Sequence, residues 1–534
     1  MKAPPHTLPS DGTPAPASKA ELATSIARDA PDGSPSGDIA HAARSGAVQV
    51  LTVAAQALLT VSHVLLARLF GRAVFGSYQA SLAILEVVTR AGNAGTAGGM
   101  LRYVAGHQAR GETHLVRSAL GTGLRLCASV CGSFVVLLML FSAQIAQISH
   151  EPRMTTALRV MAPAALFNGC MWVLVQASLA SKVTRANFIV RGLAEPMFLL
   201  GAGLTAALFG RSLLHLAVAH LVAVVATFVL AVVVVGPIFG PGELRQSLRA
   251  PWLPGFARFS LPLGVAELLN AVLQRADIVL LTMFVGTSAA GVYAASEFIT
   301  RVIANARSVF DSVAAPMFSE ALHLNQRQRL RQNLVLMTRW VATAAAPIAV
   351  SVLVLRHELL SLYGSGFQEG AAALAALALG NLVNSTCGLS GWILVVGGRS
   401  RLMLANNLVA AAVNIAMGLT LIPRIGLLGT AIAALGSVTL LQLLVAIEVW
   451  LVYRVHAFAW SLAKPFLAAA ATCGVELLVA RQIPLTAVRV PALIAAGLVT
   501  YMLCLLLLGL EPEDRRLAVK MTGRVRRWWG RSPR

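Results

Sequence analysis

Apolar blocks about twenty residues long recur along almost the whole chain, and they constrain its fold more than any other feature. A helix needs roughly 20 consecutive apolar residues to cross a bilayer, and block after block reaches that length. Of the 534 residues, 57% are hydrophobic and only 12% are charged. A soluble chain of this size would lack the charged exterior that it needs. The sequence therefore predicts an all-α polytopic membrane protein.

The blocks predict about fourteen membrane-spanning helices between two polar tails. Residues 1–45 are rich in Pro, Ser, Asp and Gly, a composition that cannot bury a core, so we predict a disordered N-terminal tail. Residues 511–534 form a basic C-terminal tail. The expected spans lie near 47–70, 77–101, 119–142, 156–180, 187–209, 213–236, 258–284, 290–317, 335–355, 371–396, 403–422, 427–452, 463–481 and 489–510.

The distribution of basic residues predicts the orientation of the spans. The net charge is +21, and most arginines and lysines lie in the even-numbered connections and in the C-terminal tail. Connections of this kind face the cytoplasm, so we expect both termini, including the tails 1–45 and 511–534, to be cytoplasmic. Because the charge sits in short loops and not on a soluble domain, it does not indicate a nucleic-acid partner.

One short segment occurs twice, 215 residues apart. "GRAVFGSYQAS" (71–81) and "GTSAAGVYAAS" (286–296) both read G-x4-G-x-Y-x-A-S, and each joins two spans. Six spans separate the copies, so they share one orientation, as in the parallel repeats of some transporters. We therefore predict two six-helix lobes in a parallel pseudo-repeat plus two C-terminal helices. The expected bounds are 46–240 for the N-lobe, 241–455 for the C-lobe and 456–510 for the extra pair.

Several segments carry a family resemblance over roughly residues 45–455, among them "LARLFGRAVFGSYQAS", "LYGSGFQEGAAALAALALGNLVN" and "LIPRIGLLGTAIA". The chain resembles the polysaccharide-export branch of the multidrug/oligosaccharidyl-lipid/polysaccharide (MOP) superfamily, the Wzx-type flippases, which are related to MurJ. The resemblance implies a flippase that moves an undecaprenyl-pyrophosphate-linked oligosaccharide, an O-antigen or exopolysaccharide repeat unit, across the bacterial inner membrane by alternating access. It implies coupling to H⁺, Na⁺ or the membrane potential, and a polymerase and glycosyltransferases of the same pathway as partners.

Such a substrate needs cations inside the membrane, because a bare pyrophosphate is costly to bury. Ionisable residues within spans are candidates for function. On the seventh span Glu267, Asn270, Gln274 and Asp277 share one helical face, which we expect to line a cavity. Arg275 lies beside them. A structural network between neighbouring spans is the alternative.

Three further spans carry an acid and an arginine at i, i+4, a spacing at which they can pair. Two interpretations of these pairs are open. The acid and the arginine form a neutral internal pair, or phosphate binds the arginine while the carboxylate accepts a proton. The candidate substrate-binding residues are Arg90, Arg191, Arg275 and Arg301, and the candidate ion-coupling residues are Asp277, Glu267, Glu297 and Glu86. Five prolines interrupt spans and are expected to bend them: Pro163, Pro196, Pro262, Pro316 and Pro347.

The sequence does not predict an enzyme, a metal site or a bound cofactor. It contains no HExxH, no CxxC and no G-x4-G-K-[ST] pattern, so zinc chemistry and direct ATP use lack support. A membrane glycosyltransferase would need larger outward connections to hold its sugar substrate. Two alternative cargoes remain: lipid II, as in MurJ-like flippases, and cationic drugs, as in MATE-like antiporters, for which a more acidic cavity is expected.

Overall fold

The computed structural model describes residues 35–181, 183–239, 242–482, 489–509 and 511, and within them all regular structure is helical. The chain divides into two units, Met1–Gln49 and Val50–Arg534, and the second holds every contact discussed below. Helix α2 begins at Pro35, within the predicted tail 1–45, and the Ala-rich run that follows favours a helix. Residues 1–34 and 512–534 of the predicted tails lie outside the described residues.

The helices follow one another with short connections. Those up to the middle of the chain are α2 (Pro35–Asn93), α3 (Thr96–Ala109), α4 (Thr113–Ile148), α5 (Arg153–Ala180), α6 (Thr184–Asn187), the π-helix η1 (Phe188–Ala194), α7 (Glu195–Phe209), α8 (Leu213–Phe239) and α9 (Glu243–Arg249). The rest are α10 (Phe256–Phe284), α11 (Thr287–His323), α12 (Arg327–Val354), α13 (Arg356–Ser361), the 3-10 helix η2 (Phe367–Gly370), α14 (Ala371–Cys387), α15 (Ser390–Val396), α16 (Ser400–Tyr453), the 3-10 helix η3 (Trp460–Leu462), α17 (Ala463–Gln482) and α18 (Arg489–Leu507).

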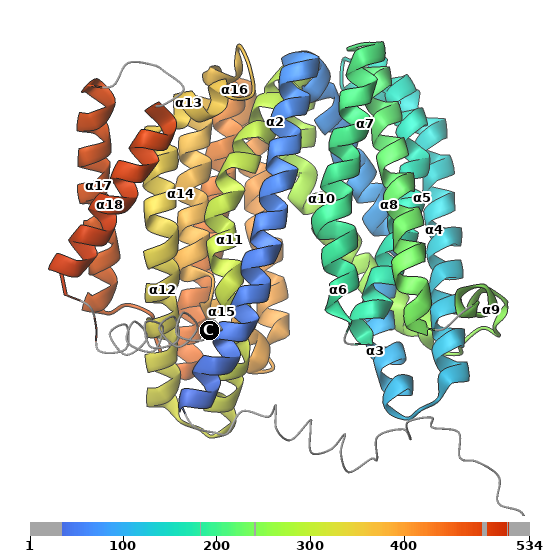
Figure 1. Cartoon of the computed structure of the whole chain (residues 1–534), viewed down its shortest axis with the longest axis horizontal. Coiled ribbons are helices and arrows are strands. Elements are labelled where there is room, and N and C mark those ends of the chain that lie inside the picture. Colours follow the sequence, from blue (N-terminus) through green and yellow to red (C-terminus); the bar gives the residue numbers. More distant parts are fainter. Residues whose placement is uncertain (1–34, 182, 240–241, 483–488, 510, 512–534) are drawn as a thin grey trace, which may run out of the picture. The chain divides into compact units, whose positions relative to one another are not determined.

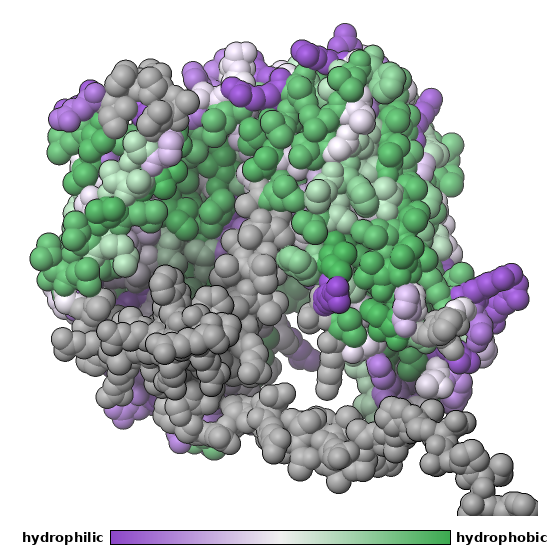
Figure 2. Space-filling model, viewed as in Figure 1, coloured by the Kyte–Doolittle hydropathy of each residue, from purple (hydrophilic) through white to green (hydrophobic). Residues whose placement is uncertain are grey.

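Eleven helices in the described part of the chain are long and apolar enough to cross a membrane. Two of these helices each contain two predicted spans that are joined across a kink, at Gly71 in α2 and at Gly426 in α16. Helix α11 is not among the eleven, although it is 37 residues long, since charged residues lower its hydropathy. Figure 2 shows hydrophobic residues over the middle of the helices and hydrophilic residues gathered at their upper and lower ends. The chain is thus an all-α polytopic membrane protein, as predicted.

The helices form two groups, called here the N-lobe and the C-lobe. In the first, α5 packs against α4 and α8, and α7 packs against α8; in the second, α14 packs against α11, α12 and α16. Figure 1 shows the first group on the right and the second on the left, with α17 and α18 outermost. The added pair attaches through α17, which packs against α12.

The two repeated segments meet each other between the lobes. Gly71 and Gly286 have similar conformations, with φ 79° and ψ 167° in the first and φ 108° and ψ 171° in the second. The second glycines of the motif are in contact: a Cβ on Gly291 would lie 2.9 Å from the Cα of Gly76. A Cβ on Gly76 would overlap the carbonyl of Thr287. Only glycine allows this backbone approach.

A second glycine contact joins the lobes at the other end of the same stretch of α2. A Cβ on Gly264 of α10 would lie 2.5 Å from the carbonyl carbon of Ala94, and one on Gly95 would overlap the carbonyl oxygen of Ser260. The segment between Gly76 and Gly95 is therefore held against the C-lobe at both of its ends.

Four of the five prolines predicted to bend spans lie inside continuous helices, namely Pro163 in α5, Pro262 in α10, Pro316 in α11 and Pro347 in α12. Pro196 differs, because it is the second residue of α7, which begins where the π-helix η1 ends. Proline lacks the N–H that the regular ladder needs at this point. The N–H of Glu195 instead donates to the carbonyl of Val190, five residues back, and such π-turns often occur at functional sites.

Candidate functional site: a charged cavity between the lobes

A cavity of about 230 Å³ lies between the lobes. Helix α2 supplies the largest share of its wall, and α5, η1, α7 and α8 of the N-lobe and α10 and α11 of the C-lobe supply the rest. Its polar and charged lining residues are His63, Tyr78, Gln79, Glu86, Thr89, Arg90, Asn93, Asn168, Arg191, Glu195, His220, Arg275, Glu297 and Arg301. All four arginines that the sequence nominated for substrate binding line this cavity.

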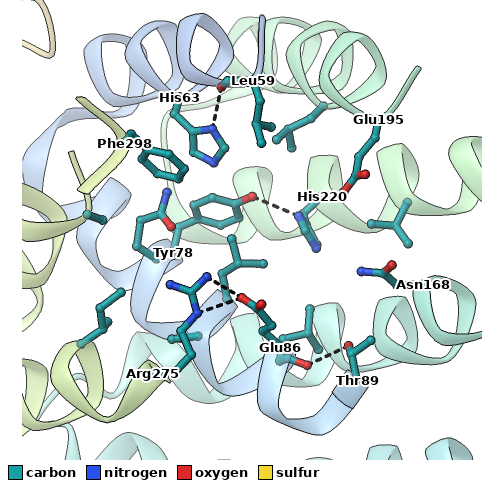
Figure 3. Close-up of a pocket in the computed structure, with 18 of the residues that line it drawn as sticks. Leu59, His63, Tyr78, Glu86, Thr89, Asn168, Glu195, His220, Arg275 and Phe298 are labelled. Atoms are coloured by element: carbon teal, nitrogen blue, oxygen red, sulfur yellow. Dashed lines mark hydrogen bonds and ion pairs between the residues drawn. The ribbon is translucent and has the colours of Figure 1, made fainter. Parts of the chain in front are cut away.

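Five of these residues form a chain of alternating charge that crosses from one lobe to the other. Arg275 of α10 donates to Oε2 of Glu86 of α2 through Nε at 2.9 Å, and its Nη2 lies 2.7 Å from the same oxygen. Figure 3 shows the two side chains meeting across the cavity. On one side the chain continues from Oε1 of Glu86 to Arg90 at 3.9 Å. On the other side Glu297 contacts Arg275 at 3.5 Å and Arg301 at 2.9 Å.

This arrangement changes one of the expected i, i+4 pairs. Glu297 and Arg301 pair as their spacing predicts, but the short contact of Glu86 is with Arg275 and not with Arg90. The carboxylate of Glu86, which is partly buried, takes the donor with the better hydrogen-bond geometry, and that donor comes from the other lobe. The chain therefore links the lobes electrostatically.

The N-lobe wall carries an aromatic platform. The guanidinium of Arg191 lies 4.1 Å from the ring centroid of Trp172, and that of Arg90 lies 5.8 Å from it. Glu195 is 3.6 Å from Nε of Arg191. Both cations are thus held by the π-face of one indole, an arrangement that stabilises a cation away from bulk water.

Neutral hydrogen bonds fill the part of the cavity near the repeated segment. The Tyr78 hydroxyl and Nδ1 of His220 are 3.0 Å apart, and Figure 3 shows them between Glu195 and Phe298. Nδ1 of His63 lies 2.8 Å from the carbonyl oxygen of Leu59, and its ring stacks on Phe298 at 4.0 Å. The positive charge of the site therefore comes from the arginines.

Helix α10 turns a different face to the cavity from the one that its polar stripe suggests. None of Glu267, Asn270, Gln274 and Asp277 lines the cavity, whereas Arg275 and Ile278 do. Asp277 faces the second repeated segment: its Oδ2 accepts a hydrogen bond from the Tyr293 hydroxyl at 2.6 Å and its Oδ1 accepts one from the N–H of Ile278 at 2.8 Å. Oε2 of Glu267 is buried without a hydrogen-bond partner. Of the four candidate coupling residues, Glu86 and Glu297 line the cavity and Asp277 and Glu267 do not.

The sequence reasoning missed Trp172 and Asn168, which both line the cavity from α5. A signal was available, because an amide and an indole lie one helical turn apart in the middle of a mainly apolar span. Within the described residues no group of three or more His, Cys, Asp or Glu could hold a metal ion.

Two lobes of membrane-spanning helices around a charged cavity define the architecture of a membrane transporter. The chain belongs to the polysaccharide biosynthesis protein family, since a family model of that description matches residues 65–372, more than half of the sequence. The sequence matches none of the curated proteins with which it was compared.

Solved structures share this fold at low sequence identity. The lipid II flippase MurJ in an inward closed conformation superposes with a TM-score of 0.67 at 12% identity, over 85% of this chain and 97% of that one. An inward-facing multidrug resistance MATE family transporter gives 0.61 at 11% identity, over 76% and 97%. A MOP superfamily transporter from Pyrococcus furiosus gives 0.55 at 11% identity, over 79% and 96%. The chain has the MOP superfamily fold, as its sequence indicated.

Proposed function

We propose that this protein is a flippase for an undecaprenyl-pyrophosphate-linked oligosaccharide, the repeat unit of an O-antigen or exopolysaccharide. One observation carries the proposal: four arginines from both lobes converge on one cavity in a member of the polysaccharide biosynthesis family. Guanidinium groups match phosphate oxygens and replace the water that a pyrophosphate loses inside a membrane. The protein makes and breaks no bond in this role.

Movement of the substrate requires the lobes to alternate between two arrangements. The cross-lobe contact of Arg275 with Glu86 suits this role, because it pairs two partly buried charges until a substrate binds. A phosphate that takes an arginine would leave a carboxylate free to accept a proton. We propose H⁺, Na⁺ or the membrane potential as the driving force, with Glu86 and Glu297 in the cavity and Asp277 and Glu267 outside it as the coupling candidates.

The proposed location is the bacterial inner membrane, with both termini in the cytoplasm. The excess of basic residues in alternate connections supports this orientation. The proposed partners are the substrate lipid, the membrane, and the polymerase and glycosyltransferases that make and use the repeat unit.

Export of polymer by cells that depend on this protein tests the proposal. Replacement of Arg90, Arg191, Arg275 and Arg301 by Ala, one at a time and at matched protein level, is expected to reduce export at least about tenfold in most variants, because each loses charged hydrogen bonds. Arg159, which donates to Ser142 and does not line the cavity, is the matched control. Full export by all four cavity variants would exclude the proposal.

The charge of the cavity speaks against cationic drugs as cargo. Its lining has four arginines and three glutamates, Glu86, Glu195 and Glu297, whereas a cation site needs an excess of acid. Binding of a cationic dye but not of inorganic pyrophosphate would favour the antiporter instead. Lipid II differs only in its sugar and peptide, so complementation of strains that lack either flippase separates these two cargoes.

A further inference from the structure

The four cavity arginines are not equivalent. Arg275 and Arg301 each have a carboxylate oxygen within hydrogen-bond distance, at 2.7 and 2.9 Å. For Arg90 and Arg191 the carboxylate contacts are 3.9 and 3.6 Å, beyond the usual range for a hydrogen bond. The first two arginines are already neutralised by protein, and the other two are held mainly by the face of Trp172.

Stacking leaves a guanidinium ready to bind an anion. Its plane is fixed by the ring while its N–H groups, which lie in that plane, remain free to donate. Nε of Arg191 is buried and has no hydrogen-bond partner. The side chains of Arg90 and Arg191 are 41% and 36% exposed, that of Arg301 is 37% exposed and that of Arg275 only 22%. Free donors therefore favour the N-lobe pair over both C-lobe arginines, and access favours it over Arg275.

Local structure explains how Arg191 comes to lie over the indole. It belongs to the π-helix that precedes Pro196, and a π-turn rotates its side chains relative to those of a regular helix. Asn168 lies one turn before Trp172 on α5 and also lines the cavity, so its amide can add a donor beside the two arginines.

We propose that Arg90, Arg191 and Trp172 form the subsite that receives the pyrophosphate group, and that Arg275 is a positioning residue that bridges Glu86 and Glu297. The subsite deepens the proposed function and depends on it. Trp172 determines its specificity by holding two guanidinium planes in place, so that a polyanionic phosphate meets preformed donors. Arg275 holds the lobes together through Glu86 and is not the first ligand of the anion.

Binding of inorganic pyrophosphate to the purified full-length protein tests this assignment. Calorimetry should show at least about tenfold weaker binding for Arg90→Ala and Arg191→Ala. Trp172→Leu should weaken binding about threefold to tenfold through the loss of cation–π contacts. Arg275→Lys and Arg301→Lys should weaken binding less than Arg90→Lys and Arg191→Lys do, because lysine at 275 and 301 can still pair with the carboxylates of Glu86 and Glu297. Inorganic sulfate at equal ionic strength controls for nonspecific anion binding.

Tryptophan fluorescence gives a readout that a purely structural role would not move. Pyrophosphate should change the emission of the wild type, and Trp172→Phe should remove that change while binding persists. Arg90→Lys and Arg191→Lys keep the positive charge, so weaker binding by these variants would not be explained by misfolding from a lost charge. They should bind pyrophosphate more weakly than the wild type, because Lys cannot stack on the indole or bind in bidentate fashion.

Three results would overturn the subsite: no pyrophosphate binding by the wild type, equal loss in all four arginine variants, or loss confined to Arg275 and Arg301. If export still depends on the cavity arginines in these cases, the proposed function stands and only the subsite is wrong. Unimpaired export by all four Ala variants would exclude the function itself.

Discussion

Residues 71–81 and 286–296 begin alike, with a first glycine at φ 79° and φ 108° respectively, and they end alike, with a serine that donates to the carbonyl four residues back. Their tyrosines differ in partner. Tyr78 meets the neutral side chain of His220 within the cavity wall, whereas Tyr293 donates to the carboxylate of Asp277, which lies outside the lining. The two copies therefore share the features that make the turn and pack the lobes, and they diverge where side chains meet other helices.

The same divergence continues one turn further along each helix. At matching positions, 215 residues apart, Glu86 corresponds to Arg301 and Arg90 to Asn305. A symmetric cavity would present the same charge twice, but this one presents opposite charges that complete a chain through Arg275. The repeat thus builds the scaffold, and the substitutions between its copies build the site.

Gly76→Val should have the largest effect, because its side chain would overlap the carbonyl of Thr287. Overpacking of this kind costs about 1–3 kcal/mol, and here it also separates the lobes. We expect lower thermal stability in detergent and a loss of export. Gly291→Ala should be milder, since its Cβ would meet Gly76 at 2.9 Å.

Gly132→Ala is the control for the glycine series. Gly132 lies in α4, and no atom comes within 4 Å of the place that an alanine Cβ would take, so alanine should leave stability unchanged or raise it. If Gly76→Val melted and exported like the wild type, the direct contact between the two copies would be refuted.

Removal of the tyrosine hydroxyl should lower the free energy of unfolding by different amounts in the two copies, because the two hydroxyls have different partners. Tyr293→Phe removes a hydrogen bond to a carboxylate and should lower the free energy of unfolding by about 1.5–3 kcal/mol. Tyr78→Phe removes a bond between neutral groups and should cost about 0.5–1.5 kcal/mol. Denaturant unfolding in detergent micelles measures both, and equal losses would contradict the difference between the copies.

Arg72→Gln should have the smallest effect. Arg72 contacts Glu369 at 2.7 Å and donates to the carbonyl of Gly366 at 3.0 Å, whereas the matching position in the second copy is Thr287. Because the side chain of Glu369 is 71% exposed, the pair should contribute less than about 1 kcal/mol and weaken as salt is added. Thermal unfolding at low and high salt measures this, and a larger loss that is independent of salt would refute it.

The sequence predicted the scaffold better than the contacts within it. Apolar block length and the repeated segment identify the spans and both lobes, because these depend on local composition and spacing. The four arginines could be nominated for the same reason: charges in apolar spans are visible in the sequence. Arg275 pairs with Glu86, which is 189 residues away in the sequence. This pairing depends on how the two lobes pack against each other, and no local sequence pattern encodes that.

Helix α10 shows the limit of periodicity most clearly. The residues of its polar stripe, from Glu267 to Asp277, do not line the cavity: Asp277 accepts a hydrogen bond from Tyr293, and Arg275 lines the cavity instead. Arg191 stacks on Trp172 from a π-helix that precedes Pro196. A periodicity based on a regular α-helix does not predict the direction of a side chain in a π-helix.

Transport by the purified protein in liposomes tests the central claim most directly. A fluorescent undecaprenyl-pyrophosphate-linked oligosaccharide, placed in both leaflets, would be followed as a reagent added outside quenches what reaches the outer leaflet. The wild type should speed this movement well above that of protein-free vesicles, and Arg90→Ala and Arg191→Ala should return it close to the protein-free rate. A wild type no faster than empty vesicles, or arginine variants as fast as the wild type, would contradict an arginine-lined passage for the lipid head group.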